Sequence, residues 1–149
     1  MKEEAELIVG TARSTAARGK QYASVPAAVE AVAKEVVDAA YKVHKTLGPG
    51  LLESVYEACL RHELKKRGLG VEAQVPVPVV YEGLHLDAGL RLDLLVDGRL
   101  IVEVKSVERM NPVYDAQLPT YLKLTGHRLG LLINFNVSVI KQGISRVVC

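Results

Sequence analysis

Cysteine, long apolar runs and net charge are all scarce in this sequence of 149 residues. Cys59 and Cys149 are its only cysteines and show no Cys-x-x-Cys or Cys/His spacing, which argues against a zinc site or a disulfide scaffold and favours a reducing cytoplasm. The longest early apolar run, Leu7 to Val9, is too short for a signal peptide or a membrane span. The net charge of +2 permits nucleic-acid contact without indicating it. These absences predict one soluble intracellular domain away from the membrane.

The first half of the chain is predicted to be mainly helical. Residues 1–24 lack a sustained period and are expected to be a tail or docking arm, and a homo-oligomer could assemble through residues 1–35. From Ser24, apolar residues recur every three or four positions to Leu47, are interrupted by Gly48-Pro49-Gly50, and resume until Gly68. The expectation is two amphipathic helices joined into a long, bent arm at the start of a domain covering residues 25–149.

After Gly70 the apolar period changes to two, which is typical of strands. The first strand contains Pro76 and Pro78 and should lie at a sheet edge, with a turn at Glu82-Gly83. A meander then continues to about residue 106, a helix is expected from about Asp115 to Lys123, and residues 129–136 are apolar enough for a central strand. This order predicts an α/β fold with a mixed central sheet flanked by helices and an N-terminal helical extension.

The segment RLDLLVDGRLIVEVKS, residues 91–106, holds three charges inside an apolar hairpin. A two-residue turn at Asp97-Gly98 would mix charged and apolar groups on both faces. A three-residue loop of Val96, Asp97 and Gly98 instead pairs Leu95 with Arg99 and sets Asp93 opposite Ile101. One face then becomes wholly apolar (Leu92, Leu94, Leu100, Val102, Val104). The other carries the charges as a surface patch, and we prefer this register.

Two carboxylates and an ammonium on one face have two interpretations. Asp93 and Glu103 would repel one another unless a cation lay between them, and carboxylate oxygens suit Mg²⁺ or Mn²⁺. Lys105 could then act on an attacking water or on charge developing at a phosphate. Alternatively, the charges simply pair across an exposed sheet face, each pair contributing a few tenths of a kcal/mol.

Several motifs in the same order resemble a known group of nucleases. Asp93 followed by Glu103-Val104-Lys105 resembles the signature of the PD-(D/E)xK nuclease superfamily, whose core is a restriction-endonuclease-like arrangement of helix, three-strand meander, helix and strand. Gln117 and Tyr121 match the Q-x-x-x-Y motif of its RecB-type members. Gly50 to Tyr56 matches G-x-x-E-x-x-Y, the motif that names the GxxExxY family of that superfamily. The resemblance covers roughly Val36 to Val148.

The resemblance implies roles for individual residues. Asp93, Glu103 and the backbone carbonyl of Val104 would hold the metal, Glu53 would add a third carboxylate, and Lys105 would act on the attacking water. Glu53 could equally be a solvated first-turn glutamate. Gln117 and Tyr121 could contact substrate or merely pack, and Arg91 could hold a phosphate or neutralise the carboxylates without metal.

Two positions depart from the superfamily pattern. Leu92 stands where the superfamily's name has proline. Pro119 interrupts the helix of the Q-x-x-x-Y motif, which requires either a late start with Asp115 as N-cap or a kink.

The resemblance as a whole predicts a nuclease that depends on Mg²⁺ or Mn²⁺ and acts on DNA in preference to RNA. A protein of the same fold that binds nucleic acid or self-assembles without catalysis is the alternative, favoured by the lack of a basic stripe.

Overall fold

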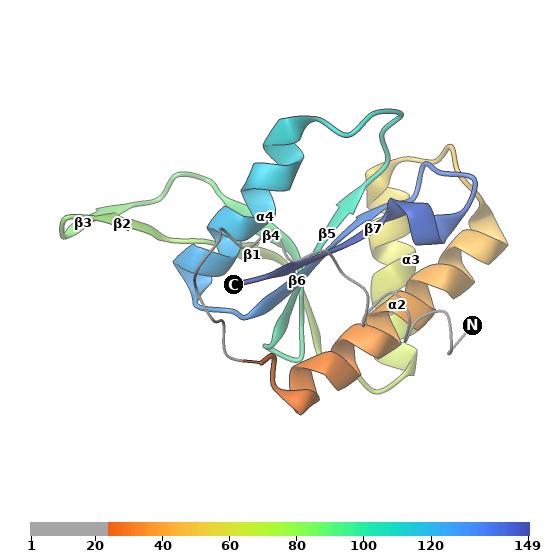
Figure 1. Ribbon diagram of the computed structural model, residues 1–149, viewed down its shortest axis with the longest axis horizontal. Helices are drawn as coiled ribbons and strands as arrows, with labels where there is room; N and C mark the ends of the chain where they lie inside the picture. Colours follow the sequence, from red (N-terminus) through yellow and green to blue (C-terminus); the bar gives the residue numbers. More distant parts are fainter. Residues whose placement is uncertain (1–23) are drawn as a thin grey trace.

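A five-stranded mixed sheet forms the centre of the protein in the computed structural model, which describes residues 24–149 (Figure 1). The strand order is β1-β4-β5-β6-β7, and only β5 and β6 run parallel. The elements are α2 (Ala27–Leu47), α3 (Glu53–Lys66), β1 (Val71–Pro76), β2 (Val79–Tyr81), β3 (Leu84–Leu86), β4 (Arg91–Val96), β5 (Leu100–Lys105), α4 (Pro112–Thr125), β6 (Leu129–Asn134), the 3₁₀ helix η1 (Ile140–Gly143) and β7 (Ile144–Val148). The predicted α/β class and mixed sheet are confirmed. The predicted N-terminal arm falls almost wholly on residues 1–23, outside the described residues.

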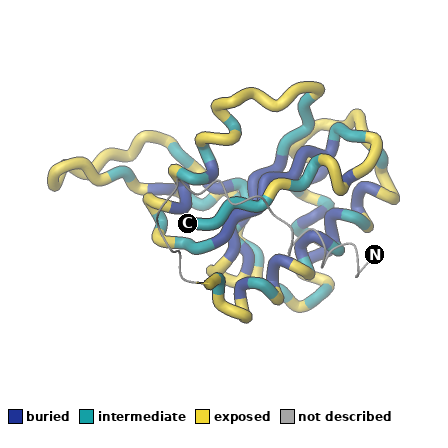
Figure 2. Tube along the Cα trace, in the orientation of Figure 1, coloured by how far each residue is buried: buried dark blue, intermediate teal, exposed yellow. Residues whose placement is uncertain are grey.

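Helices cover both faces of the sheet and divide the core in two. Helices α2 and α3 pack on one face, and α4 packs on the other (Figure 1). All six residues of β6 are buried, as predicted for a central strand, although it ends at Asn134. Figure 2 shows that the buried chain follows the sheet and the inner sides of the helices. None of the described helices is long and apolar enough to cross a membrane.

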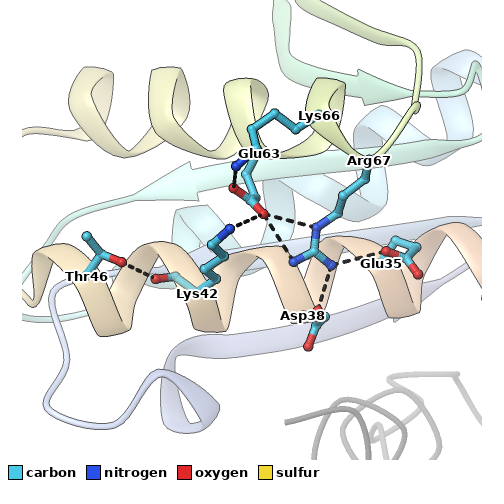
Figure 3. A network of polar contacts seen from close by, with 7 residues as sticks. All are labelled: Glu35, Asp38, Lys42, Thr46, Glu63, Lys66 and Arg67. Atoms are coloured by element: carbon cyan, nitrogen blue, oxygen red, sulfur yellow. Dashed lines mark hydrogen bonds and ion pairs between the residues drawn. The ribbon is translucent and has the colours of Figure 1, made fainter.

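Helices α2 and α3 fold back on one another, so the expected long, bent arm is wrong. Arg67 near the end of α3 donates to Asp38 at 2.6 Å and to Glu35 at 3.1 Å, both on α2 (Figure 3). Glu63 accepts from Lys42 at 3.0 Å and from Arg67 at 3.3 Å in the same network. The apolar stripes of both helices must reach the same sheet face, and a helical hairpin achieves this while an extended arm would not.

The β4–β5 hairpin has the predicted loop length but another register. Leu95 pairs with Ile101 and Val96 with Leu100, so the loop is Asp97, Gly98 and Arg99 rather than Val96 to Gly98. Asp97 explains the shift, because its N–H donates to the Gly70 carbonyl and its carboxylate accepts from the Gly70 N–H, both at 2.7 Å. The register moved by two residues, which preserves the predicted separation of faces for most positions.

The segment between β1 and β4 is an insertion rather than part of the meander. Strands β2 and β3 form a separate two-stranded sheet that projects from the body (Figure 1). Its turn is Glu82-Gly83, as predicted, with φ values of 46° and 81°. Strand β1, with Pro76 at its end, lies at the edge of the main sheet, also as predicted.

Helix α4 begins earlier than predicted. Its N-cap is Asn111, whose side chain accepts from the Val113 N–H at 2.9 Å, and Asp115 lies within the first turn. The proline at position 112 explains the early start, since proline is favoured in the first helical turn. Pro119 lies inside the helix, which continues through it to Thr125. The late start with Asp115 as N-cap is therefore wrong.

Candidate active site

Asp93 and Glu103 lie side by side where strands β4 and β5 stop pairing. The last backbone pair between the strands is Leu94 with Val102, and side-chain bonds replace the ladder beyond it. The Val104 N–H donates to Asp93 Oδ2 at 2.8 Å, and the Asp93 N–H donates to Glu103 Oε1 at 3.3 Å. The structure thus joins Asp93 to Glu103 directly, and the predicted position of Asp93 opposite Ile101 is wrong.

A local change of strand direction accounts for the position of Asp93. Ala73 of β1 and Leu94 of β4 pack with the helices α2 and α3, whereas Val75 and Leu92, two residues along, pack with the α4 side. Strict alternation would put all four on one face. Gln74, between the two pairs and opposite Asp93, has φ of 54°. This left-handed residue turns the strand pair, so Leu92 leaves the predicted apolar face.

Glu103 is buried, contrary to the predicted surface patch. It is 3% exposed on a strand that α4 covers. Burial, followed by the negative charge of Asp93 and a hydrogen bond to it, raises the pKa of Glu103 from 4.5 to about 9. The carboxyl group is therefore protonated at neutral pH when no cation is present. An exposed charge-pairing face, the alternative interpretation of this hairpin, does not describe these two carboxylates.

Lys105 lies at the end of β5 on the same face as Glu103. Its Nζ lies 4.5 Å from the centre of the Tyr114 ring, in the first turn of α4. In the part of the chain that the structure describes, Lys105 forms no ion pair with Asp93 or Glu103. The ammonium group therefore lies against an aromatic face. It is not bonded to Asp93 or Glu103, which we call the acidic pair.

Gln117 and Tyr121 are joined to each other. Gln117 Nε2 donates to Tyr121 Oη at 2.7 Å, so Pro119 has not separated the two side chains. Tyr121 is 4% exposed and belongs to the core on the α4 side. Burial, together with the charges of Glu103 and Asp93, raises the pKa of its phenol. Tyr121 thus packs in the core and lies close enough to Asp93 and Glu103 for their charges to raise its pKa.

Glu53 and Arg91 are less closely joined to this centre. Glu53 is exposed in the first turn of α3, and Arg91 is exposed at the start of β4, beside Pro76 of the edge strand. One turn after Glu53, Glu57 accepts from Gln74 Nε2 at 3.2 and 3.3 Å. Burial raises the pKa of Glu57, and the charge of Asp93 adds to that effect.

Three residues near the acidic pair were not predicted. These are Glu57, Gln74 and Tyr114. Helical periodicity could have indicated Glu57, because it lies four residues after Glu53 on the same side of α3. Nothing in the local pattern distinguishes Gln74, since its backbone conformation is visible only in the folded chain.

The donor set fits a hard divalent cation in part. Asp93 and Glu103 supply carboxylate oxygens at adjacent positions, and the negative charge of Asp93 raises the pKa of Glu103. The Val104 N–H faces Asp93, and because the N–H and C=O of one strand residue point to the same neighbour, the Val104 carbonyl also faces β4. Within residues 24–149, however, no three His, Cys, Asp or Glu side chains lie together as a metal-binding group.

Comparison with known proteins agrees with the motif order. A family model described as the PD-(D/E)XK nuclease superfamily matches residues 30–147, most of the chain. No curated protein and no solved structure gives a significant match. The matched region contains the acidic pair, Lys105 and all of α4. The chain belongs to the PD-(D/E)XK nuclease superfamily.

Proposed function

We propose that the protein is a metal-dependent nuclease that hydrolyses phosphodiester bonds, with DNA favoured over RNA as substrate. The observation that carries the proposal is the contact between Asp93 and Glu103, with Lys105 two residues further along the same strand face. A buried carboxyl beside a second carboxylate is costly to charge, and a divalent cation would offset that cost. If position 103 served only the stability of the sheet, an apolar residue there would stabilise the fold more than a buried glutamate does.

The residues divide into those that hold the metal and those that act on the substrate. Asp93, Glu103 and the Val104 carbonyl would hold Mg²⁺ or Mn²⁺, and Glu53, in the first turn of α3, would add a third carboxylate. When bound, the ion supplies positive charge to the phosphate and favours ionisation of water. Lys105 would orient the attacking water or stabilise the developing negative charge.

Three further side chains are proposed to contact the substrate. Gln117 and Tyr121 share a face of α4 that is directed at the acidic pair, so their polar atoms can meet a nucleotide bound there. Arg91 is exposed two residues before Asp93 and could bind a backbone phosphate with its guanidinium. These are the groups through which substrate preference would be expressed.

We further propose that the protein is a GxxExxY-type member with a restriction-endonuclease-like core. The tyrosine of that motif, Tyr56, donates to the Gly48 carbonyl at 2.5 Å and accepts from the Leu51 N–H at 3.1 Å. Its ring stacks on Phe135 at 4.6 Å between centroids. Tyr56 thereby holds the turn that precedes Glu53, which gives the motif a physical role in placing that carboxylate.

A non-catalytic protein that binds nucleic acid or self-assembles is the second candidate. The observation in its favour is that the described residues contain no group of three potential metal ligands. The two candidates differ in one outcome, because a binding protein would retain nucleic-acid affinity without cleavage. Self-association through the N-terminal segment is proposed in either case, and light scattering of a chain lacking residues 1–23 tests it.

Cleavage with purified protein tests the proposal. Supercoiled plasmid and a labelled single-stranded oligonucleotide are incubated with Mg²⁺, Mn²⁺ or EDTA. We expect metal-dependent cleavage that Asp93→Ala and Lys105→Ala each reduce at least a hundredfold. The exposed sheet carboxylate Glu72→Ala and the helix-surface Lys65→Ala are matched controls that should cleave normally. Full activity in both site variants refutes the mechanism, while metal binding without cleavage favours the second candidate.

A further inference from the structure

Helix α4 presents a longer polar stripe to strand β5 than the Q-x-x-x-Y motif suggests. Tyr114 lies three residues before Gln117 and seven before Tyr121, and these spacings put all three on one helix face. The face is directed at β5, since Tyr114 contacts Lys105 and the charge of Glu103 acts on Tyr121. The first member of the stripe, Tyr114, therefore contacts Lys105, the lysine of the proposed catalytic set Asp93, Glu103 and Lys105.

The contact between Lys105 and Tyr114 has the geometry of a cation–π interaction. The ammonium nitrogen lies 4.5 Å from the ring centre, within the range of about 6 Å in which the ring quadrupole attracts a cation. Tyr114 is itself fixed, because its N–H donates to the Asn111 carbonyl at 2.9 Å and its ring packs beside the core on the α4 side. A fixed ring therefore binds a lysine side chain that would otherwise be flexible.

Without that ring, Lys105 would have another partner. Glu103 lies two residues away on the same strand face, about 7 Å along the strand, which a lysine side chain can span. An ion pair with Asp93, or with Glu103 once it is ionised, would occupy a carboxylate and move the ammonium away from the attacking water. The described residues show the opposite arrangement, with Lys105 on Tyr114 and unpaired with either acid.

We infer that Tyr114 is a positioning residue that holds the Lys105 ammonium at the end of β5, clear of the acidic pair. The inference rests on the proposed nuclease function. Tyr114 acts through its ring face, so phenylalanine should replace it and leucine should not. Its hydroxyl plays no part, and its packing against the core is a separate contribution that both substitutions largely keep.

The experiment compares Tyr114→Leu with Tyr114→Phe in the full chain. With Mn²⁺ and the labelled oligonucleotide, we expect Tyr114→Leu to lower kcat about tenfold with KM nearly unchanged, and Tyr114→Phe to stay within about twofold of wild type. Tyr81→Leu makes the same change at an exposed tyrosine on the β2–β3 hairpin and should leave kcat unchanged. Circular dichroism confirms that each variant is folded.

A spectroscopic measurement reports the contact without any cleavage. In protein labelled with ¹³C at lysine Cε, the Lys105 resonance is assigned by Lys105→Arg. The Tyr114 ring current should move its ε protons upfield of the other lysines, and the shift should vanish in Tyr114→Leu and persist in Tyr114→Phe. This readout responds to ring geometry and not to general packing.

The two readouts separate the possible failures. A wild-type spectrum without the upfield shift overturns the inference even if the protein cleaves DNA. Wild-type kcat in Tyr114→Leu also overturns it, as does an equal loss in Tyr114→Phe. If the wild-type protein binds Mn²⁺ but cleaves neither substrate, the proposed function fails. The positioning role of Tyr114 then fails with it, even where the upfield shift shows the contact between Lys105 and Tyr114.

Discussion

The buried Glu103 carboxyl makes a specific prediction about stability and pH. In EDTA, Glu103→Gln should be more stable than wild type at neutral pH. The reason is the pKa, which is 4.5 for an unperturbed glutamate and about 9 for Glu103 in the folded protein. Between these values the folded chain holds a proton that the unfolded chain has released, so wild-type stability falls as pH rises.

The magnitude follows from linkage. One proton of difference lowers stability by about 1.4 kcal/mol per pH unit, which accumulates to about 3 kcal/mol between pH 4.5 and pH 7. Glutamine is neutral throughout, resembles the protonated acid in shape, and can donate to Asp93 as that acid does. The advantage of Glu103→Gln should therefore be on the order of 3 kcal/mol at pH 7 and vanish near pH 4.5.

Urea unfolding followed by circular dichroism at pH 5, 6, 7 and 8 measures the effect. The control is Glu72→Gln, an exposed carboxylate on the edge strand β1, whose midpoint should follow wild type at every pH. The reasoning fails if Glu103→Gln is less stable than wild type at pH 8, or if the difference between them does not change with pH. Wild type should also bind Mn²⁺ more tightly at pH 8 than at pH 6, since the metal must displace the Glu103 proton.

Two other substitutions test the packing that supports the site. Arg67→Ala removes the guanidinium that joins α3 to Asp38 and leaves Glu63 with fewer hydrogen-bond donors. Urea unfolding should show a loss of about 2 kcal/mol in the free energy of unfolding. An unchanged midpoint would mean that the network in Figure 3 does not stabilise the protein. Gly143→Ala would place a Cβ 2.1 Å from the Asn134 carbonyl oxygen, a backbone atom that cannot move aside. Gly143→Ala should lower the free energy of unfolding by more than about 3 kcal/mol. Gly130→Ala should lower it less, because the close atoms there belong to a leucine side chain. Equal thermal stability of the two variants would contradict this reasoning.

Much of the fold follows from local pattern. The apolar spacing of α2 and α3, the Glu82-Gly83 turn, the edge position of β1 and the buried strand β6 were all predicted correctly. These features depend on periodicity, turn chemistry and proline, which act over a few residues. The separation of charged from apolar positions in β5 followed in the same way, because strand alternation has a strict period of two.

Other features depended on contacts between distant parts of the chain. The hairpin loop shifted by one residue because Gly70, 27 positions before Asp97, bonds to it twice. Glu103 is buried because α4 covers its face of the sheet, and no pattern within a single strand records which helix will cover it.

Local pattern and tertiary structure determine different properties of the site. Side-chain type and spacing indicate which residues could do the chemistry, and they predicted Asp93, Glu103 and Lys105. Their state is set by what surrounds them: the turn at Gln74 brings Asp93 to Glu103, burial holds the proton on Glu103, and Tyr114 receives Lys105. Dielectric environment and long-range contact arise only when the chain is folded, so they belong to the tertiary structure.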